Sequence, residues 1–252
     1  MCGISRQKFL KLLLAGGAAL APGLRALGDA RLDNLRGDRV GWARLKTPSP
    51  NWKRHAGADP MLTQFFHDHT TLNIEPKWYE ADAADLDQLS HFPFLFSQGL
   101  DMITEPASRH NIAEFIRRGG FMLVDACHDI HVTPDFDEFL RQQNAFYADI
   151  LPEAKIVPLP VTHDVYQIYF KFPDGKPPHT FMSGVYDEQK AAHGLLGVMI
   201  GKRMAGIISV CGWQCGWDHV TEHPSPVEQG TEDVLCMRMV TNIYVYAMTE
   251  IG

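Results

Sequence analysis

Residues 119–131 read Gly-Gly-Phe-Met-Leu-Val-Asp-Ala-Cys-His-Asp-Ile-His, and this stretch decides the fold. A glycine pair ends one element, and the four apolar residues of 121–124 follow without a polar interruption. Such an unbroken apolar run is typical of a strand buried on both faces, as in a parallel sheet. Metal-competent polar side chains come directly after it, and open α/β sheets bind ligands beyond the carboxyl ends of their strands. The stretch therefore predicts a central parallel strand that leads into a functional site.

Segments on either side of this strand alternate between strand and helix patterns. Strands are expected over 40–46, 72–78, 92–97 and 155–159, and a β-hairpin over 195–200 and 203–210. Helices are expected to begin at capping residues followed by proline, at Asp59-Pro60, Thr104 before Pro106 and Thr133-Pro134. Other expected segments are a short helical segment at 85–89, irregular structure at 165–193, a long loop at 211–229 and a closing helix at 231–249. The pattern predicts an α/β, flavodoxin-like fold, with a mostly parallel sheet, helices on both faces and a β-hairpin near the C-terminal end.

Composition limits the partners of the chain. Its 252 residues are 45% hydrophobic and 21% charged, which is ordinary for a soluble globular protein, and the formal net charge is −7. Four of the 23 basic residues lie in the first 28 positions, so the remainder has 19 basic and 30 acidic residues, or −11. A surface this acidic repels nucleic acid and anionic lipid, and we expect neither as a partner.

The first 28 residues have the pattern of an export signal. Basic residues precede a short apolar run at 12–20, and Ala26-Leu27-Gly28 matches a small-residue cleavage site. The segment Ser5 to Lys11 resembles the twin-arginine export motif, with Gln7 in place of the second arginine. A general secretory signal and an uncleaved anchor are the alternatives, and only the uncleaved anchor would make the membrane a partner.

Domain organisation and location follow from that signal. We expect residues 29–39 to form a flexible lead-in and residues 40–252 to form a single α/β domain in the bacterial periplasm or outside the cell. Four cysteines remain in that domain, too few for a disulfide framework even in an oxidising compartment: Cys127, Cys211, Cys215 and Cys236. For Cys211 and Cys215, a disulfide, a metal site and free thiols all stay open.

Several landmarks together resemble the bacterial domain of unknown function family 4159. They are Trp42-Ala43-Arg44-Leu45-Lys46, Phe92-Pro93-Phe94-Leu95-Phe96, the run from Phe115 to Asp125, Leu159-Pro160 before His163, and the ending Asn242 to Thr249. That family is similar to the class I glutamine amidotransferase and trehalose-utilisation superfamily, which implies a flavodoxin-like fold. The resemblance also implies that Asp125 and Cys127 lie near the nucleophile position of the amidotransferases. The chain lacks a Gly-x-Cys-x-Gly elbow, so amidotransferase activity is not carried over.

The residues after the central strand suggest a metal site. His128 and His131 are three positions apart, and Asp125 lies beside them. His163 follows a later expected strand, and Asp218 lies in the expected long loop. Imidazole and carboxylate are suitable ligands for zinc, iron or manganese. Three ligands with an open position would favour hydrolysis through an activated water, with Asp125 as a ligand or general base.

A cysteine nucleophile is the second hypothesis. Cys127 follows the strand end, and a Cys–His–acid arrangement activates a thiol. Adjacent side chains at a strand end diverge, so His163 is the expected partner rather than His128. In this version Asp125, Cys127 and His163 are the catalytic residues.

The third hypothesis is a ligand-binding or scaffold role without chemistry. Trp213 and Trp217 could form an aromatic wall for a small molecule, a sugar or a peptide. This role is our leading expectation for an exported protein with a polar crevice at its strand ends. A metal-dependent hydrolase and a Cys–His hydrolase or amidotransferase-like enzyme are the alternatives, and the sequence identifies no protein partner.

Overall fold

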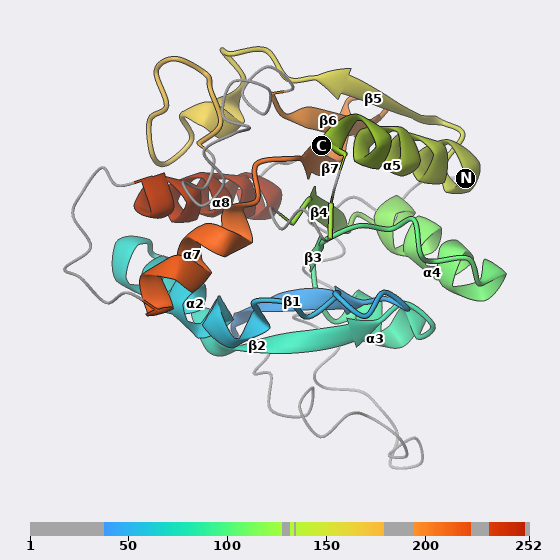
Figure 1. Cartoon of the computed structure of the whole chain (residues 1–252), viewed down its shortest axis with the longest axis horizontal. Helices are drawn as coiled ribbons and strands as arrows, with labels where there is room; N and C mark the ends of the chain where they lie inside the picture. Colours follow the sequence, from blue (N-terminus) through green and yellow to red (C-terminus); the bar gives the residue numbers. More distant parts are fainter. Residues whose placement is uncertain (1–37, 128–131, 134, 179–193, 223–231, 250–252) are drawn as a thin grey trace.

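The computed structural model describes residues 38–127, 132–133, 135–178, 194–222 and 232–249. Within these residues seven strands form one sheet in the order β2-β1-β3-β4-β7-β6-β5 (Figure 1). Neighbours from β2 to β7 run parallel, whereas β7, β6 and β5 pair antiparallel. The predicted α/β class, the mostly parallel sheet and the C-terminal hairpin are therefore confirmed.

The elements have the following bounds. The strands are β1 (Val40–Lys46), β2 (Ile74–Asp82), β3 (Phe94–Ser97), β4 (Phe121–Asp125), β5 (Ala154–Pro158), β6 (Leu196–Ile200) and β7 (Arg203–Ser209). The helices are η3 (Ala56–Ala58), α2 (Asp59–His69), α3 (Leu86–Ser90), α4 (Pro106–Arg117), α5 (Phe136–Ile150), η4 (Asp164–Tyr166), α7 (Trp213–Glu222) and α8 (Glu232–Thr249). None of these described helices combines the length and the apolar character needed to cross a lipid bilayer.

Helices cover both faces of the sheet, and each face has its own apolar core. Helices α2, α7 and α8 lie on one face, and α3, α4 and α5 lie on the other (Figure 1). Successive side chains of a strand point to opposite faces. Accordingly β3 sends Phe94 and Phe96 into the first core and Leu95 into the second. The apolar run 121–124 is fully buried in the same alternating way, as its sequence predicts.

The order β2-β1-β3-β4 is that of flavodoxin-like doubly wound sheets. The connection after β1 runs through α2 over one face, and the connection after β3 runs through α4 over the other. The direction in which successive strands are added to the sheet thus reverses between β1 and β3. The crevice at their carboxyl ends is the topological switch point, where such sheets bind ligands.

Elements differ from the sequence expectation at several places, three of which have a local physical reason. Helix α5 is capped by Asp135 and not by Thr133, because the Asp135 carboxylate accepts the backbone N–H of Glu138. Helix α4 starts directly at Pro106 and has no side-chain cap, so Thr104 is not its cap. Strand β2 begins at Ile74 rather than at residue 72 and continues to Asp82, past the expected end at 78. It includes Pro76, which is tolerated because β2 is an edge strand and an edge residue can lack a ladder donor.

The largest difference lies in the segment expected as a long loop, where the structure has helix α7. The sequence of this segment does not predict a helix, because glycine has a low helix propensity and tryptophan a moderate one. Packing supplies the missing stability. A Cβ atom on Gly216 would lie 3.0 Å from Cβ of Cys236 in α8, so glycine permits the close approach of the two helices. The tertiary contact, rather than local propensity, thus explains α7.

Candidate functional site

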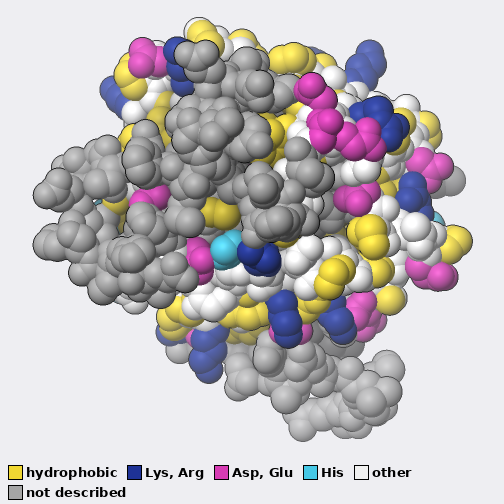
Figure 2. Space-filling view, in the orientation of Figure 1, with side chains coloured by type: hydrophobic (Ala, Val, Ile, Leu, Met, Phe, Trp, Pro, Cys, Tyr) yellow, Lys and Arg dark blue, Asp and Glu magenta, His cyan; other side chains and the backbone are white. Residues whose placement is uncertain are grey.

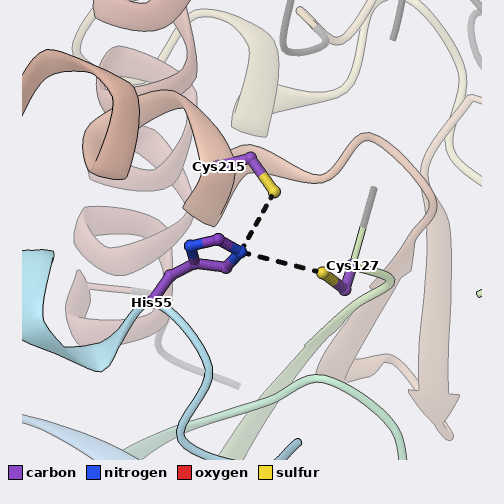
Figure 3. A group of neighbouring side chains, drawn as sticks. All are labelled: His55, Cys127 and Cys215. Atoms are coloured by element: carbon purple, nitrogen blue, oxygen red, sulfur yellow. Dashed lines mark hydrogen bonds between the residues drawn. The ribbon is translucent and has the colours of Figure 1, made fainter. Parts of the chain in front are cut away.

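Three side chains from distant parts of the chain meet beyond the carboxyl ends of the central strands (Figure 3). His55 lies in the loop after β1, Cys127 lies just after β4, and Cys215 lies in the first turn of α7. Their ligand atoms all lie within 4.8 Å of one another. Nε2 of His55 is 4.0 Å from Sγ of Cys127 and 3.8 Å from Sγ of Cys215. The two sulfur atoms therefore share one imidazole nitrogen at nearly equal distances.

The other nitrogen of His55 contacts Asp218, which lies one turn after Cys215 on α7. Because the two ring nitrogens point in different directions, this contact between Nδ1 and the carboxylate aims Nε2 at the sulfur atoms. The side chains of His55 and Asp218 are 20% and 23% exposed, so solvent reaches this end of the site. Cys127 and Cys215, in contrast, are both buried.

Electrostatics restrict how many of these groups ionise together. The hydrogen bond with Cys127 raises the pKa of His55, Asp218 raises it further, and burial opposes both effects. The neighbouring Cys127 and burial raise the pKa of the Cys215 thiol. Like charges at this separation disfavour each other, so two thiolates persist here only beside a cation. One imidazolium compensates a single thiolate, and a divalent metal ion compensates both.

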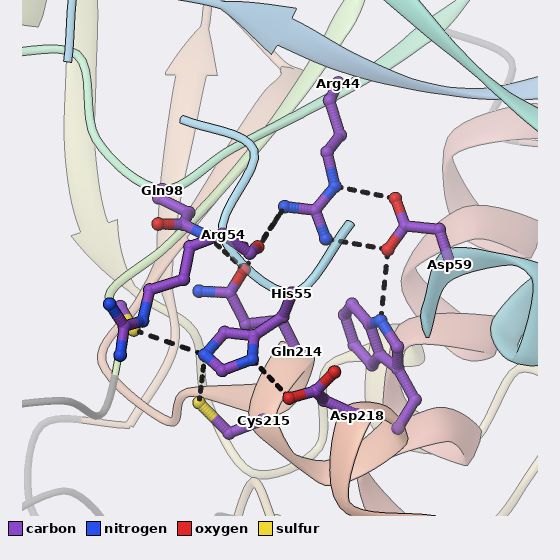
Figure 4. A network of polar contacts seen from close by, with 10 residues as sticks. Arg44, Arg54, His55, Asp59, Gln98, Gln214, Cys215 and Asp218 are labelled. Atoms are coloured by element: carbon purple, nitrogen blue, oxygen red, sulfur yellow. Dashed lines mark hydrogen bonds and ion pairs between the residues drawn. The ribbon is translucent and has the colours of Figure 1, made fainter. Parts of the chain in front are cut away.

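A buried ion pair anchors the elements around the site (Figure 4). Arg44 of β1 donates from Nε and Nη2 to the two carboxylate oxygens of Asp59 at 2.6 and 2.7 Å, and both side chains are fully buried. The indole N–H groups of Trp42 and Trp217 donate to the same carboxylate at 2.9 and 3.1 Å. One carboxylate thus joins β1, α2 and α7 through four donors.

The same network fixes the backbone that precedes His55. Nη1 of Arg44 and Nε2 of Gln98 each donate to the Arg54 carbonyl oxygen at 2.9 Å. Nε2 of Gln98 also donates to Oε1 of Gln214 on α7 at 2.6 Å. His55 has φ 60°, and it is the one non-glycine residue with positive φ in the described part of the chain. This unfavourable conformation persists because buried donors hold the peptide next to it, a feature common at functional positions.

Comparison with known protein families places this site in context. The family described as a domain of unknown function (DUF4159) matches residues 42–248. The chain belongs to the DUF4159 family. A comparison with curated proteins finds no match. The matched span of this DUF4159 protein includes His55, Cys127, Cys215 and Asp218, so the site lies inside the family's domain.

Asp125, expected as a ligand or general base, has a different position in this DUF4159 protein. Its carboxylate accepts the backbone N–H groups of Gly212 and Trp213 at 3.1 and 2.6 Å, and it is fully buried. These are N–H groups at the start of α7, which no helical carbonyl can satisfy. Asp125 therefore ties the Cys215 helix to the end of β4. It is not in the His55, Cys127 and Cys215 group.

Burial raises the pKa of Asp125 to about 7, although its hydrogen bonds act in the opposite direction. Between its ordinary pKa of 3.8 and pH 7, the folded state keeps a proton that the unfolded state has lost. The contribution of Asp125 to stability therefore falls as pH rises across this window, by up to about 4 kcal/mol. We expect Asp125→Asn to remove this decline. Chemical denaturation of both metal-free proteins from pH 4.5 to 7.5 measures it, and parallel stability curves would contradict the expectation.

The other expected site residues divide into three cases. His128 and His131 lie outside the described residues. Asp218 contacts His55, as an orienting group rather than as a member of the metal-competent group. His163 lies elsewhere: its Nδ1 accepts the backbone N–H of Val165, and its ring packs on Tyr246 of α8. The structure does not bring His163 together with Cys127 in the described group.

The structure also corrects the expected aromatic wall and narrows the alternatives left open for Cys211 and Cys215. Trp213 and Trp217 are both completely buried, with indole donors bound to Pro178 and Asp59, so they are core residues and not a ligand surface. Cys211 and Cys215 form no disulfide in the described structure. Cys215 faces His55 instead.

Two site residues were not predicted to belong to this site: His55 was not singled out, and Cys215 was left open between a disulfide, a metal site and a free thiol. Each had a usable signal. His55 follows the strand over 40–46, whose carboxyl end lies at the same sheet edge as that of the central strand. Cys215 and Asp218 are three positions apart, a spacing that shares a face only on a helix. Because residues 211–229 were expected to form a loop, the spacing of Cys215 and Asp218 was not interpreted in this way.

Proposed function

We propose that this chain binds a divalent metal ion, preferably zinc, through His55, Cys127 and Cys215, and hydrolyses a small substrate at that centre. The observation that carries the proposal is the position of Nε2 of His55 between two thiol sulfur atoms at 3.8 and 4.0 Å. In a tetrahedral zinc site with Zn–S of about 2.3 Å and Zn–N of about 2.0 Å, sulfur and nitrogen are about 3.6 Å apart. The two nitrogen–sulfur distances would each have to shorten by only a few tenths of an ångström to match this geometry.

The donor set selects the kind of metal. Two thiolates and an imidazole suit zinc, whereas manganese prefers oxygen ligands. Of the zinc, iron and manganese expected from the sequence, zinc fits this set best. Three protein ligands resemble catalytic rather than structural zinc sites, which leave a fourth position for water or substrate. When bound, such an ion acts as a Lewis acid and lowers the pKa of a coordinated water.

The surrounding residues have roles that agree with this proposal. Asp218 on Nδ1 is the carboxylate that commonly orients a metal-binding histidine. Asp125 fixes the α7 start, and thereby Cys215, relative to Cys127. The exposed ends of His55 and Asp218 mark the direction from which a substrate would approach.

A thiol nucleophile is the second candidate, because Asp218, His55 and Cys127 follow one another as acid, base and thiol. Two observations weigh against it. Sγ of Cys215 also contacts Nε2 of His55, and a Cys–His nucleophile does not need a second thiol on its base. Cys127 also lacks the positive φ of a strained nucleophile turn, which His55 has instead. Kinship with the class I glutamine amidotransferase superfamily is part of this second candidate and is supported by the strand order.

We place this activity outside the cytoplasm, on the sequence pattern of residues 1–28. A metal bound between the thiols would suit that location, because coordinated thiolates are protected from forming the disulfide that an oxidising compartment favours. A twin-arginine route would also export the domain with its metal already bound.

Metal analysis of the full chain tests the proposal. We expect about one zinc ion per chain in the wild type, none in His55→Ala, and retention in Asp218→Asn with 10- to 100-fold weaker affinity. His67→Ala, an exposed histidine at the end of α2, is the matched control and should keep its zinc. Zinc-dependent cleavage of para-nitrophenyl acetate or bis(para-nitrophenyl) phosphate, lost with a chelator and restored by zinc, tests hydrolysis. Equal zinc content in wild type and His55→Ala would overturn the metal centre.

A further inference from the structure

A pocket of about 340 Å³ opens at the carboxyl ends of β1 and β3. Its walls come from the loop after β1, the loop after β3 and the start of α5, including Thr47, Trp52, Gln98, Asp101 and Asp135. This is the switch point of the doubly wound sheet, where the fold places ligands. The volume also falls in the range of small-molecule sites. Position and size thus both indicate a ligand pocket.

The charge of the walls is one-sided. Among the described residues, the lining contains the carboxylates of Asp101, Asp135 and Glu138 and no lysine, arginine or histidine. Arg141 compensates Glu138 at 2.6 Å, but Asp101 and Asp135 are in no ion pair among the described residues. Figure 2 shows acidic side chains gathered over α5, at whose start Asp135 and Glu138 lie. The described part of the lining therefore carries uncompensated negative charge.

A buried acceptor in the pocket wall lacks a partner. Gln98 is 8% exposed, and its Nε2 donates to Arg54 and Gln214. Its Oε1 has no hydrogen-bond partner in the described structure. The amide turns its oxygen away from Gln214 (Figure 4). Buried polar atoms are nearly always paired, so this oxygen keeps the capacity to accept one more hydrogen bond beside the pocket.

Trp52 adds an aromatic face to this lining. The Lys53 ammonium already lies 5.7 Å from the centre of its indole ring, which shows that the ring accommodates a cation. Carboxylates, an unpaired acceptor and an indole face together match an organic cation. An anionic ligand would be repelled by the carboxylates of this lining.

We propose that this pocket binds a small molecule with a primary ammonium group beside hydroxyl or amide donors. Asp101 and Asp135 would hold the ammonium group and Trp52 would pack against its carbon skeleton. Gln98 connects the pocket to the metal-competent group, because it also bonds to the carbonyl that precedes His55. That the ligand is the substrate of the hydrolytic centre rests on the proposed function, whereas its binding does not.

Calorimetric titration of the full chain with glucosamine, glucose and lysyl-glycine tests this proposal. We expect both ammonium compounds to bind, and glucose to bind at least about 10-fold more weakly than glucosamine. Their relative affinities distinguish an amino sugar from a basic peptide end as the source of the ammonium. The Asp101→Asn, Asp135→Asn double variant should lose about 10-fold in affinity for the preferred amine. Asparagine is as good an N-cap as aspartate, so α5 should keep its start.

The matched control is Asp85→Asn, which changes the N-cap of α3, a residue outside the pocket lining. It should leave amine binding unchanged. Amine binding that persists in metal-free and His55→Ala protein supports the pocket even if the metal centre fails. Normal zinc content with equal affinity for glucose and glucosamine, no detectable amine binding, or an unchanged affinity in the double variant would overturn the pocket proposal alone.

Discussion

Replacing Arg44 with alanine is expected to lower the free energy of unfolding by about 3–5 kcal/mol. The change leaves the Asp59 carboxylate fully buried, with two indole N–H donors in place of a bidentate guanidinium. It also removes a donor from the carbonyl oxygen that precedes His55. A buried charge without its partner is among the most destabilising changes a core can receive. Urea denaturation at neutral pH measures the loss.

The matched control for this change is Arg141→Ala. Arg141 also binds a carboxylate through two nitrogen atoms at 2.6 Å, but the pair is exposed on α5. Exposed pairs contribute about 0–1 kcal/mol, so the control should be nearly neutral. If Arg44→Ala does not fold, the double variant Arg44→Ala, Asp59→Ala separates the causes, because removing both charges should be less damaging than the sum of the single changes. A loss below about 1 kcal/mol for Arg44→Ala would contradict the expected role of the pair.

Replacing Cys127 or Cys215 with serine is expected to weaken zinc binding by more than about 100-fold in either case. Loss of an orienting group alone typically weakens metal binding 10- to 100-fold, and a ligand should matter more. The two sulfur atoms lie at 4.0 and 3.8 Å from the same nitrogen, so their losses should be similar. Competition titration against a chromophoric zinc chelator measures both affinities under the same conditions.

Equality of the two variants is the decisive readout, because a thiol nucleophile predicts a different pattern. In that case Cys127→Ser would abolish activity, Cys215→Ser would retain it, and neither would change the zinc content. Cys236→Ala is the cysteine control, since Cys236 lies in the core beside α7 and outside the metal-competent group. Zinc affinity that survives the loss of either site thiol would eliminate the metal centre.

The sequence predicted most of the sheet because the relevant signals are local. An uninterrupted apolar run, such as 121–124, predicts a strand with both faces buried. The hairpin over 195–210 is predicted by the Gly201-Lys202 turn between its two strands. Helix α7 was not predicted, because its stability comes from packing against α8 through Gly216. The hydrophobic periodicity of this segment is too weak to outweigh the low helix propensity of its residues. The N-cap positions of α4 and α5 lie one and two residues after the predicted ones, because several neighbouring residues can serve as a cap.

The site was less predictable than the fold. The sequence pointed to the region beyond the central strand and named Cys127 and Asp218, but it paired Cys127 with His163 and took Asp218 as a metal ligand, whereas both residues contact His55. Asp125 was expected to do chemistry, but two backbone N–H groups at the start of α7 engage its carboxylate. For His55 the sequence offered only its place after the first strand, because a single histidine in a turn acquires a role only from what the fold places beside it.

By itself the sequence determined the fold class, the buried central strand and the edge of the sheet at which polar side chains gather, since periodicity and burial are encoded in neighbouring residues. Only the tertiary structure decided which side chains meet there. His55 is 72 positions from Cys127 and 160 from Cys215 along the chain, and the sheet order, the α7–α8 contact and the buried Arg44–Asp59 pair bring them together. Such long-range contacts depend on the strand order and the loop conformations of the whole domain, which no short stretch of sequence specifies.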